Sequence, residues 1–251
     1  MPRLDASRFK IERANHHIRQ LEESIAGFAK SDFYSVAVKQ DLKSGQNGLV
    51  FTIKHSPSVD AALILGDALH NLRSSLDILW NEVVSFLTGQ RSDDYTMFPV
   101  RKTAEKVEAA INRALKNKII DRPAFERVWN LMFVRIQPYE CGNDAVWGLH
   151  RLNIIDKHRL IIPVPHLMSV SDICLQNKET GAEERFQFIL DDSGVISIKM
   201  RGNLRVKDKG HAAATVFFDV GLPYEGKAVI STLQQLAVKM NDVVEAFAAT
   251  W

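Results

Sequence analysis

The feature that most constrains the fold is a run of apolar residues at helical spacing in the first third of the chain. Its apolar side follows a heptad-like pattern made by Leu65, Leu69, Leu72, Leu76, Leu79, Val83 and Phe86. Ser56-Pro57 is a suitable start and Gly89 a suitable stop, so the pattern predicts a helix from about Ser58 to Leu87. Because such a seam needs other helices to bury it, we expect a helical bundle around it.

Apolar residues recur at helical spacing in several other segments. The first of these places Ile11, Ile18, Leu21 and Ile25 on one side of a helix. We expect these helices at residues 5–30, 103–117, 123–135, 144–159 and 227–248. With the central helix they give a bundle of about five to six helices.

Two β-rich runs, at residues 34–40 and 49–54, flank Lys43-Ser-Gly-Gln-Asn-Gly48 and predict a hairpin that turns at the Asn-Gly pair. Later runs at residues 173–176, 185–190, 195–200 and 213–220 predict an antiparallel meander, with a tight turn at Asp191-Asp-Ser-Gly194. Pro163 and Pro165 interrupt the segment from Leu160 to Val164, which we expect to be irregular or an edge piece.

These elements predict an α+β fold, in which the N-terminal hairpin packs onto the C-terminal meander to form one antiparallel sheet that shares a core with the bundle. We expect a single domain over residues 1–251. The competing division is a mainly helical part at 1–159, a β meander at 160–226 and a closing helix at 227–251. The closing helix argues against a clean split, because it needs a partner and can return to the bundle.

Composition excludes several classes of protein. The 32 basic and 30 acidic residues leave a net charge of +2, which is too balanced to indicate nucleic-acid binding by charge alone. Two isolated cysteines, Cys141 and Cys174, make a disulfide framework and a cysteine zinc site improbable. The chain shows no signal-peptide pattern and no apolar run of the ~18 residues that a membrane span requires. We therefore expect a soluble cytoplasmic protein without membrane partners.

The central helix has an unusual polar side, because the stretch from Val59 to Asn81 contains no Lys and no Glu. Its polar positions are Asp67, His70, Asn71, Arg73, Ser74, Ser75, Asp77 and Asn81, and most of them gather opposite the leucine seam. A buried or interface-facing polar strip would explain this choice of residues. The alternative is an ordinary amphipathic helix in which Arg73 and Asp77 form a spaced ion pair.

A second unusual helix spans Trp147 to Arg159, where apolar residues point in several directions and indicate burial on most sides. It nevertheless carries His150, Asn153 and Lys157 on one stripe, while Arg151 and His158, seven residues apart, lie in line on another. Buried charges here would need partners such as Asp67 or Asp77. The alternatives are a structural salt-bridge network between the two helices, or cations that cap the helix C-terminus.

Two segments, Gly66-Asp-Ala-Leu-His-Asn-Leu-Arg-Ser-Ser-Leu-Asp77 and Leu152-Asn-Ile-Ile-Asp-Lys-His-Arg159, resemble a pattern in uncharacterised bacterial and phage proteins. Arg151, six residues and His158 also resemble the Arg and His signature of the HEPN superfamily, helical-bundle proteins that include metal-independent RNases. Two positions depart from that signature. Leu152 replaces the usual polar residue after the Arg, and Ile78 stands where a second His would follow Arg73.

This resemblance implies RNA as a partner, a homodimer and cleavage without a metal. His158 would carry the proton and Arg151 would hold the phosphoryl oxygens, because an imidazole ordinarily titrates near neutral pH and a guanidinium pairs with phosphate. The supporting candidates are Asp67, His70, Asn71, Arg73, Asp77, Asn153, Asp156, Lys157 and Arg159. The alternative is a non-enzymatic, dimeric interaction protein whose polar strips are internal networks.

Other chemistries find little support in the sequence. It has no Gly-rich phosphate loop and no Gly-x-Ser-x-Gly nucleophile elbow, so we expect no cofactor. A metal site from His70, an aspartate and His150 or His158 is a weaker alternative, because the Glu-x-x-His pairing of di-iron bundles is missing. We therefore expect no metal at the candidate site.

Overall fold

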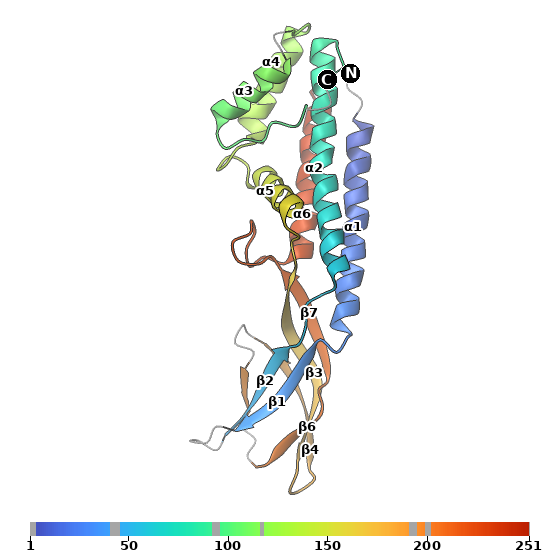
Figure 1. Ribbon diagram of the computed structural model, residues 1–251, viewed down its shortest axis with the longest axis vertical. Coiled ribbons are helices and arrows are strands. Elements are labelled where there is room, and N and C mark those ends of the chain that lie inside the picture. Colours follow the sequence, from blue (N-terminus) through green and yellow to red (C-terminus); the bar gives the residue numbers. More distant parts are fainter. Residues whose placement is uncertain are drawn as a thin grey trace.

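The structure, a computed structural model, describes residues 4–40, 46–91, 96–115, 118–190, 195–198 and 202–250. The molecule is elongated, with the helices in one half and the strands in the other (Figure 1). In this part of the chain the helices are α1 (Asp5–Ala29), α2 (Val59–Thr88), α3 (Ala104–Leu115), α4 (Arg122–Asn130), α5 (Asp144–His158) and α6 (Val229–Ala248), with a π-helix, η1 (Leu131–Ile136), after α4. The predicted α+β class is thereby confirmed.

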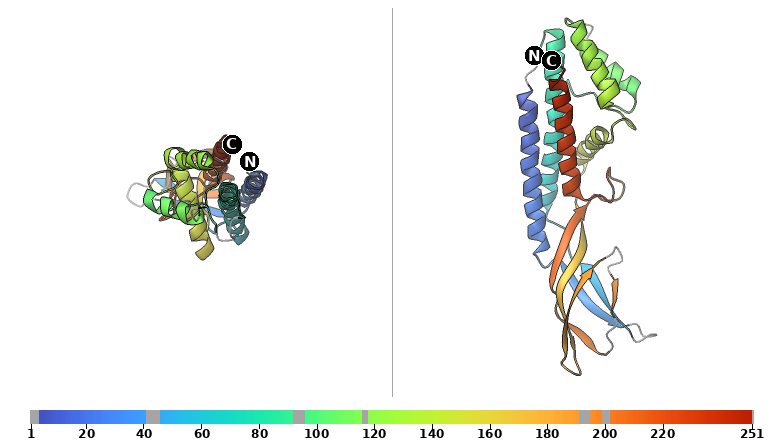
Figure 2. Two further views of the ribbon diagram at one scale, coloured as in Figure 1. Left: turned by 90° about the horizontal axis from the view of Figure 1, so that it is seen from above. Right: turned by 180° about the vertical axis from the view of Figure 1, so that it is seen from behind.

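The long helices α1, α2 and α6 run side by side, and both chain ends lie at the end of the bundle remote from the strands (Figures 1 and 2). Helix α2 is the central one, because its seam from Leu65 to Leu79 is completely buried. It ends as predicted at Gly89, which adopts a left-handed conformation with φ of 65°. Arg8 joins the start of α1 to the end of α6 through a 2.8 Å hydrogen bond from Nε to Oε1 of Glu245.

The strands form two antiparallel sheets with a shared apolar core. The first contains β1 (Tyr34–Gln40), β2 (Asn47–Ile53) and β5 (Val195–Ile198), in the order β1-β2-β5. The second contains β3 (Val164–Asn177), β4 (Glu183–Ile189), β6 (Leu204–Asp208) and β7 (His211–Phe217), and β3 pairs with the other three. The side chains between them, Phe33, Tyr34, Leu49, Val170, Ile173, Leu175 and Leu204, are buried.

This arrangement differs from a single sheet that shares one core with the helices. The hairpin recruits β5 from the C-terminal region, and the resulting sheet packs against the other four strands. The bundle has its own separate apolar cluster around α2. Both β segments are insertions into the bundle, since the hairpin lies between α1 and α2 and the remaining strands lie between α5 and α6.

The predicted hairpin turn at the Asn-Gly pair is wrong. Asn47 and Gly48 lie inside β2, opposite Gln40 and Lys39, so the pair belongs to the ladder. Residues 41–45, which include the start of the predicted turn, lie outside the described residues, as does the predicted turn at 191–194.

The later strands also differ from the prediction. Strand β3 begins at Val164 and includes Pro165, which is opposite Val216 of β7. Pro165 is tolerated there because β4 pairs with β3 only from Ser169 onward, so one side of this segment is an edge. Strand β6 was not predicted, because Arg205 and Lys207 interrupt its short apolar pattern. The helix predicted at 123–135 is divided into α4 and η1.

Over the described ranges, none of the helices combines the length and apolarity that crossing a bilayer would require.

Candidate functional site

Helix α5 positions the predicted catalytic residues. Its N-terminus is capped by Asn143, whose side-chain oxygen accepts hydrogen bonds of 3.1 Å from the N–H groups of Ala145 and Val146. Leu149 and Leu152 face the bundle core and are completely buried, which fixes the rotation of the helix. The opposite face is therefore turned to solvent.

Arg151, Lys157, His158 and Arg159 are all exposed, and none of them makes an ion pair with another described residue. The expectation that this helix is buried on most sides, with its charges paired to Asp67 or Asp77, is therefore wrong for its C-terminal half. Arg151 and His158 are separated by seven residues, a rise of about 10.5 Å along one face of the helix. The two side chains are reachable from solvent and free to bind an external group.

At the centre of α2, in contrast to the exposed end of α5, the charged side chains are paired within the chain. Arg73 is only 5% exposed. One of its nitrogens, Nη1, donates to Oδ1 of Asp77 at 2.6 Å, and Nη2 donates to the carbonyl of Phe98 at 2.9 Å. The same Asp77 oxygen accepts the N–H of Phe98 at 2.8 Å. Arg73 and Asp77 thus hold the segment before α3 against α2, and this closed network is structural.

On either side of this network, some polar residues of α2 make contacts within the chain and others are exposed. Asn81 donates to the carbonyl of Thr96 at 2.8 Å, which extends the attachment of the same segment. Asn71 is buried and accepts a 3.2 Å hydrogen bond from Lys10 of α1. Asp67 and His70 are exposed. The strip is therefore divided between structural contacts and free surface.

His150 of α5 lies close enough to charged side chains of both α5 and α2 for their charges to affect it. Its side chain is partly buried, and its Nδ1 is a buried atom without a hydrogen-bond partner among the described residues. The pKa of His150 is lowered to about 4, mainly by burial and also by the charges of Arg73, Arg101, Arg151 and Lys157. The imidazole is therefore neutral at pH 7 in a local field that is positive, although the whole chain is nearly neutral.

Asp156 of α5 packs against α2. Its carboxylate lies against Gly66, where an added Cβ would stand 2.5 Å from Oδ2. Its Oδ1 is buried and has no partner among the described residues. Burial raises the pKa of this carboxyl, and the nearby charge of Asp67 raises it as well. Asn153, on the same side of α5, is 5% exposed. These two candidates therefore pack between helices.

The described part of the chain brings no three His, Cys, Asp or Glu side chains together in a way that could hold a metal ion. The weaker metal hypothesis, which combined His70 with Asp67 or Asp77 and with His150 or His158, therefore finds no such group among the described residues.

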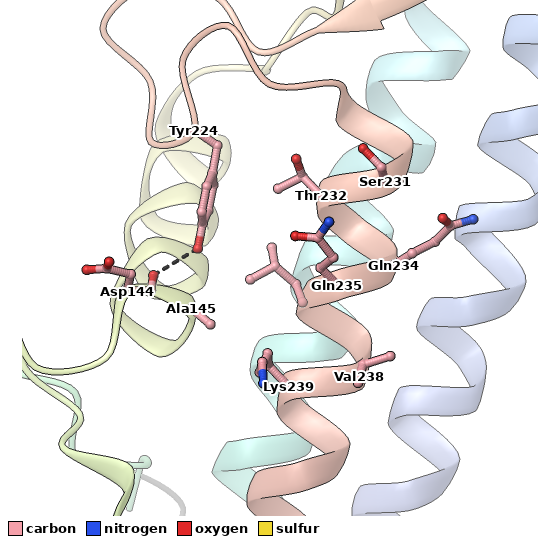
Figure 3. Close-up of a pocket in the computed structure, with 10 residues that line it drawn as sticks. Asp144, Ala145, Tyr224, Ser231, Thr232, Gln234, Gln235, Val238 and Lys239 are labelled. Carbon is pink, nitrogen blue, oxygen red and sulfur yellow. Dashed lines mark hydrogen bonds between the residues drawn. The ribbon is translucent and has the colours of Figure 1, made fainter.

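A cavity of about 560 Å³ lies between the start of α5 and the first half of α6. Figure 3 shows Tyr224 and Ala145 on one side of it, with Thr232, Gln235 and Lys239 on the other. This cavity was not predicted from the sequence. A signal for it is present in α6, because no charged residue occurs from Ala228 to Val238 although several of these positions are exposed.

The chain was compared with protein-family models, with curated proteins and with solved structures, and none of these comparisons gave a significant match.

Proposed function

We propose that the exposed Arg151 and His158 of α5, here called the cationic stripe, together with Lys157 and Arg159 beside them at the end of the helix, bind the phosphodiester backbone of RNA and cleave it without a metal. The observation that carries this proposal is that these side chains are exposed and make no ion pair within the described residues. Charges that served only to hold α5 in place would be expected to be paired. The positive field around His150 adds support, since Arg151 and Lys157 of α5 contribute to it together with Arg73 of α2 and Arg101.

The proposed reaction uses the 2′-hydroxyl of RNA as the nucleophile. Its oxygen attacks the adjacent phosphorus, His158 takes the hydroxyl proton, and the bond from phosphorus to the 5′ oxygen breaks. The products are a 2′,3′-cyclic phosphate and a 5′-hydroxyl, whose oxygen takes a proton from water. Arg151 binds the phosphoryl oxygens and stabilises the charge that develops on them. His158 then returns its proton to solvent.

The resemblance to HEPN proteins, which stays a hypothesis, adds a homodimer in the cytoplasm to this proposal. A second copy would provide another α5 stripe and lengthen the surface available to an RNA strand.

A second candidate function is that of a non-enzymatic, dimeric interaction protein. The closed network of Arg73, Asp77 and Phe98 favours it, because this part of the polar strip is already used within the chain. In that case the stripe of α5 would bind an acidic partner and no bond would be cleaved.

The deciding experiment is incubation of the purified full chain with single-stranded RNA in EDTA. We expect cleavage to 2′,3′-cyclic phosphate ends, and a loss of about 100-fold or more in rate for His158→Ala and Arg151→Ala. His16→Ala and Arg19→Ala are the matched controls, because both residues are exposed on α1. Uncut RNA, or cleavage that survives His158→Ala, would reject the nuclease proposal. A dimer in light scattering without cleavage would favour the interaction protein.

A further inference from the structure

The cavity between α5 and α6 has one aromatic wall that is held in place by several contacts. Tyr224 donates from its hydroxyl to the carbonyl of Asp144 at 2.8 Å. Its ring packs directly on α5 at Gly148, where an added Cβ would stand 2.3 Å from the Tyr224 hydroxyl oxygen. Tyr224 also adopts a left-handed φ of 65°, which is unfavourable for a residue with a side chain. The surrounding contacts therefore maintain a strained backbone that presents this ring.

The opposite wall, on α6, combines apolar surface with one free amide. Figure 3 shows that Gln235 points toward Tyr224, whereas the neighbouring Gln234 extends toward α1. The hydroxyl of Thr232 is already used, since it donates to the carbonyl of Ala228 at 2.8 Å. The carboxamide of Gln235 is exposed and makes no hydrogen bond within the described residues. It is available to donate to and accept from a ligand.

The size and chemistry of the cavity suit a planar heterocyclic ligand. Its volume of about 560 Å³ lies within the range typical of small-molecule sites. A flat aromatic ring opposite a carboxamide can stack on one face of a planar ligand and hydrogen-bond to its edge. Nucleobases have both features, and stacking on aromatic side chains is the usual way in which proteins hold unpaired bases.

The cavity and the cationic stripe share helix α5, because Asp144 and Ala145 line the cavity at the start of this helix. Asp144, at its rim, precedes Arg151 by seven residues, and Arg151 precedes His158 by seven. These three residues therefore follow one face of the helix in steps of about 10.5 Å. An RNA strand that lies along this face can place a phosphate at Arg151 and a neighbouring base at the cavity.

We propose that this cavity binds an unpaired nucleobase of the RNA, stacked on Tyr224 and hydrogen-bonded by the carboxamide of Gln235. The inference rests on the proposed function and adds to it a subsite that would select single-stranded substrate and discriminate among bases. The base would anchor the strand, while Arg151 and His158 act on the adjoining backbone.

The test uses uncharged nucleosides, which lack the phosphate that the stripe would bind. Adenosine, guanosine, cytidine and uridine are titrated separately into the ¹⁵N-labelled full chain, and amide shifts are followed by NMR. We expect saturable shifts at Tyr224 and in the first half of α6. Gln235→Ala should weaken binding about 3- to 10-fold and Tyr224→Leu about tenfold or more. Asn241→Ala is the matched control, because Asn241 is exposed on the same helix and does not line the cavity, and it should bind like the unmodified chain.

Tyr224→Phe is the control for misfolding, because this variant retains the ring and loses only the hydrogen bond to Asp144. It should bind nucleosides within a few-fold of the unmodified chain. The inference is overturned if no nucleoside shifts these resonances at millimolar concentration, or if Gln235→Ala binds as well as the unmodified chain. Cleavage of RNA without nucleoside binding would reject the base subsite alone. Nucleoside binding that depends on Gln235 in a chain that does not cut RNA would support the subsite and reject the nuclease.

Discussion

The polar strips of α2 and α5 have similar compositions but opposite environments. On α2, Arg73 and Asp77 are held by each other and by the backbone of Phe98. On α5, Arg151 and His158 are exposed and unpaired within the described residues. The difference arises from the segment before α3, which covers the middle of α2 and supplies it with backbone partners. A polar strip on a buried helix is thus structural where another segment covers it, and available for function where it faces solvent.

The largest expected effect comes from breaking the closed network. Arg73→Met would leave Asp77 without its charged partner, so we expect the free energy of unfolding to fall by about 3–5 kcal/mol. Arg151→Met should change it by about 0.5 kcal/mol or less, because the side chain is exposed. Urea denaturation followed by circular dichroism measures both. Equal losses for the two variants would contradict the contrast between the strips.

A smaller effect is expected where the two helices touch. Gly66→Ala would place a Cβ 2.5 Å from Oδ2 of Asp156, and we expect a loss of about 1–3 kcal/mol in spite of the better helix propensity of alanine. Gly27→Ala in α1 is the matched control, since its Cβ would meet nothing within 4 Å. That variant should gain up to about 1 kcal/mol in the same urea assay. A gain at both positions would show that Asp156 moves aside readily.

The effect that is smallest at neutral pH, and develops only in acid, is the pH dependence of stability caused by His150. Its pKa in the folded chain is about 4, against an ordinary value of 6.5, so the unfolded chain binds more protons between these pH values. The free energy of unfolding should therefore fall as pH drops from about 6.5 to about 4, with no further loss from this group below that range. His150→Gln should reduce the slope, whereas His16→Gln on exposed α1 should preserve it. An unchanged slope in His150→Gln would place the pH dependence elsewhere.

The helices were predictable to within a few residues, because local signals define them. The seam of α2 and its stop at Gly89 are both encoded within the segment itself. The sheets were less predictable, since their pairing is not local. Nothing near Asn47 indicates that β2 pairs with β5, and the turn preference of the Asn-Gly pair was overridden by this tertiary ladder.

The candidate site was likewise predictable only where local sequence signals define it. Helical periodicity placed Arg151 and His158 correctly on one face of α5. It could not show which strip would be covered, because the segment around Phe98 has no periodicity that reveals its path over α2. Tyr224 was missed for a related reason, since its role depends on a loop that contacts α5 at Gly148, far away in the sequence.

The two insertions into the bundle have a consequence for synthesis on the ribosome. Helix α6, which packs against α1 and α2, follows all the described strands in the chain, so the bundle cannot close until α6 has been synthesised. All the strands are available before then, and the two sheets can assemble while α1 and α2 still expose the surface that α6 will cover. A nascent chain that has not yet reached α6 therefore exposes the apolar surface that α6 will cover, and stalled or truncated products that lack α6 should be those that chaperones and proteases bind first.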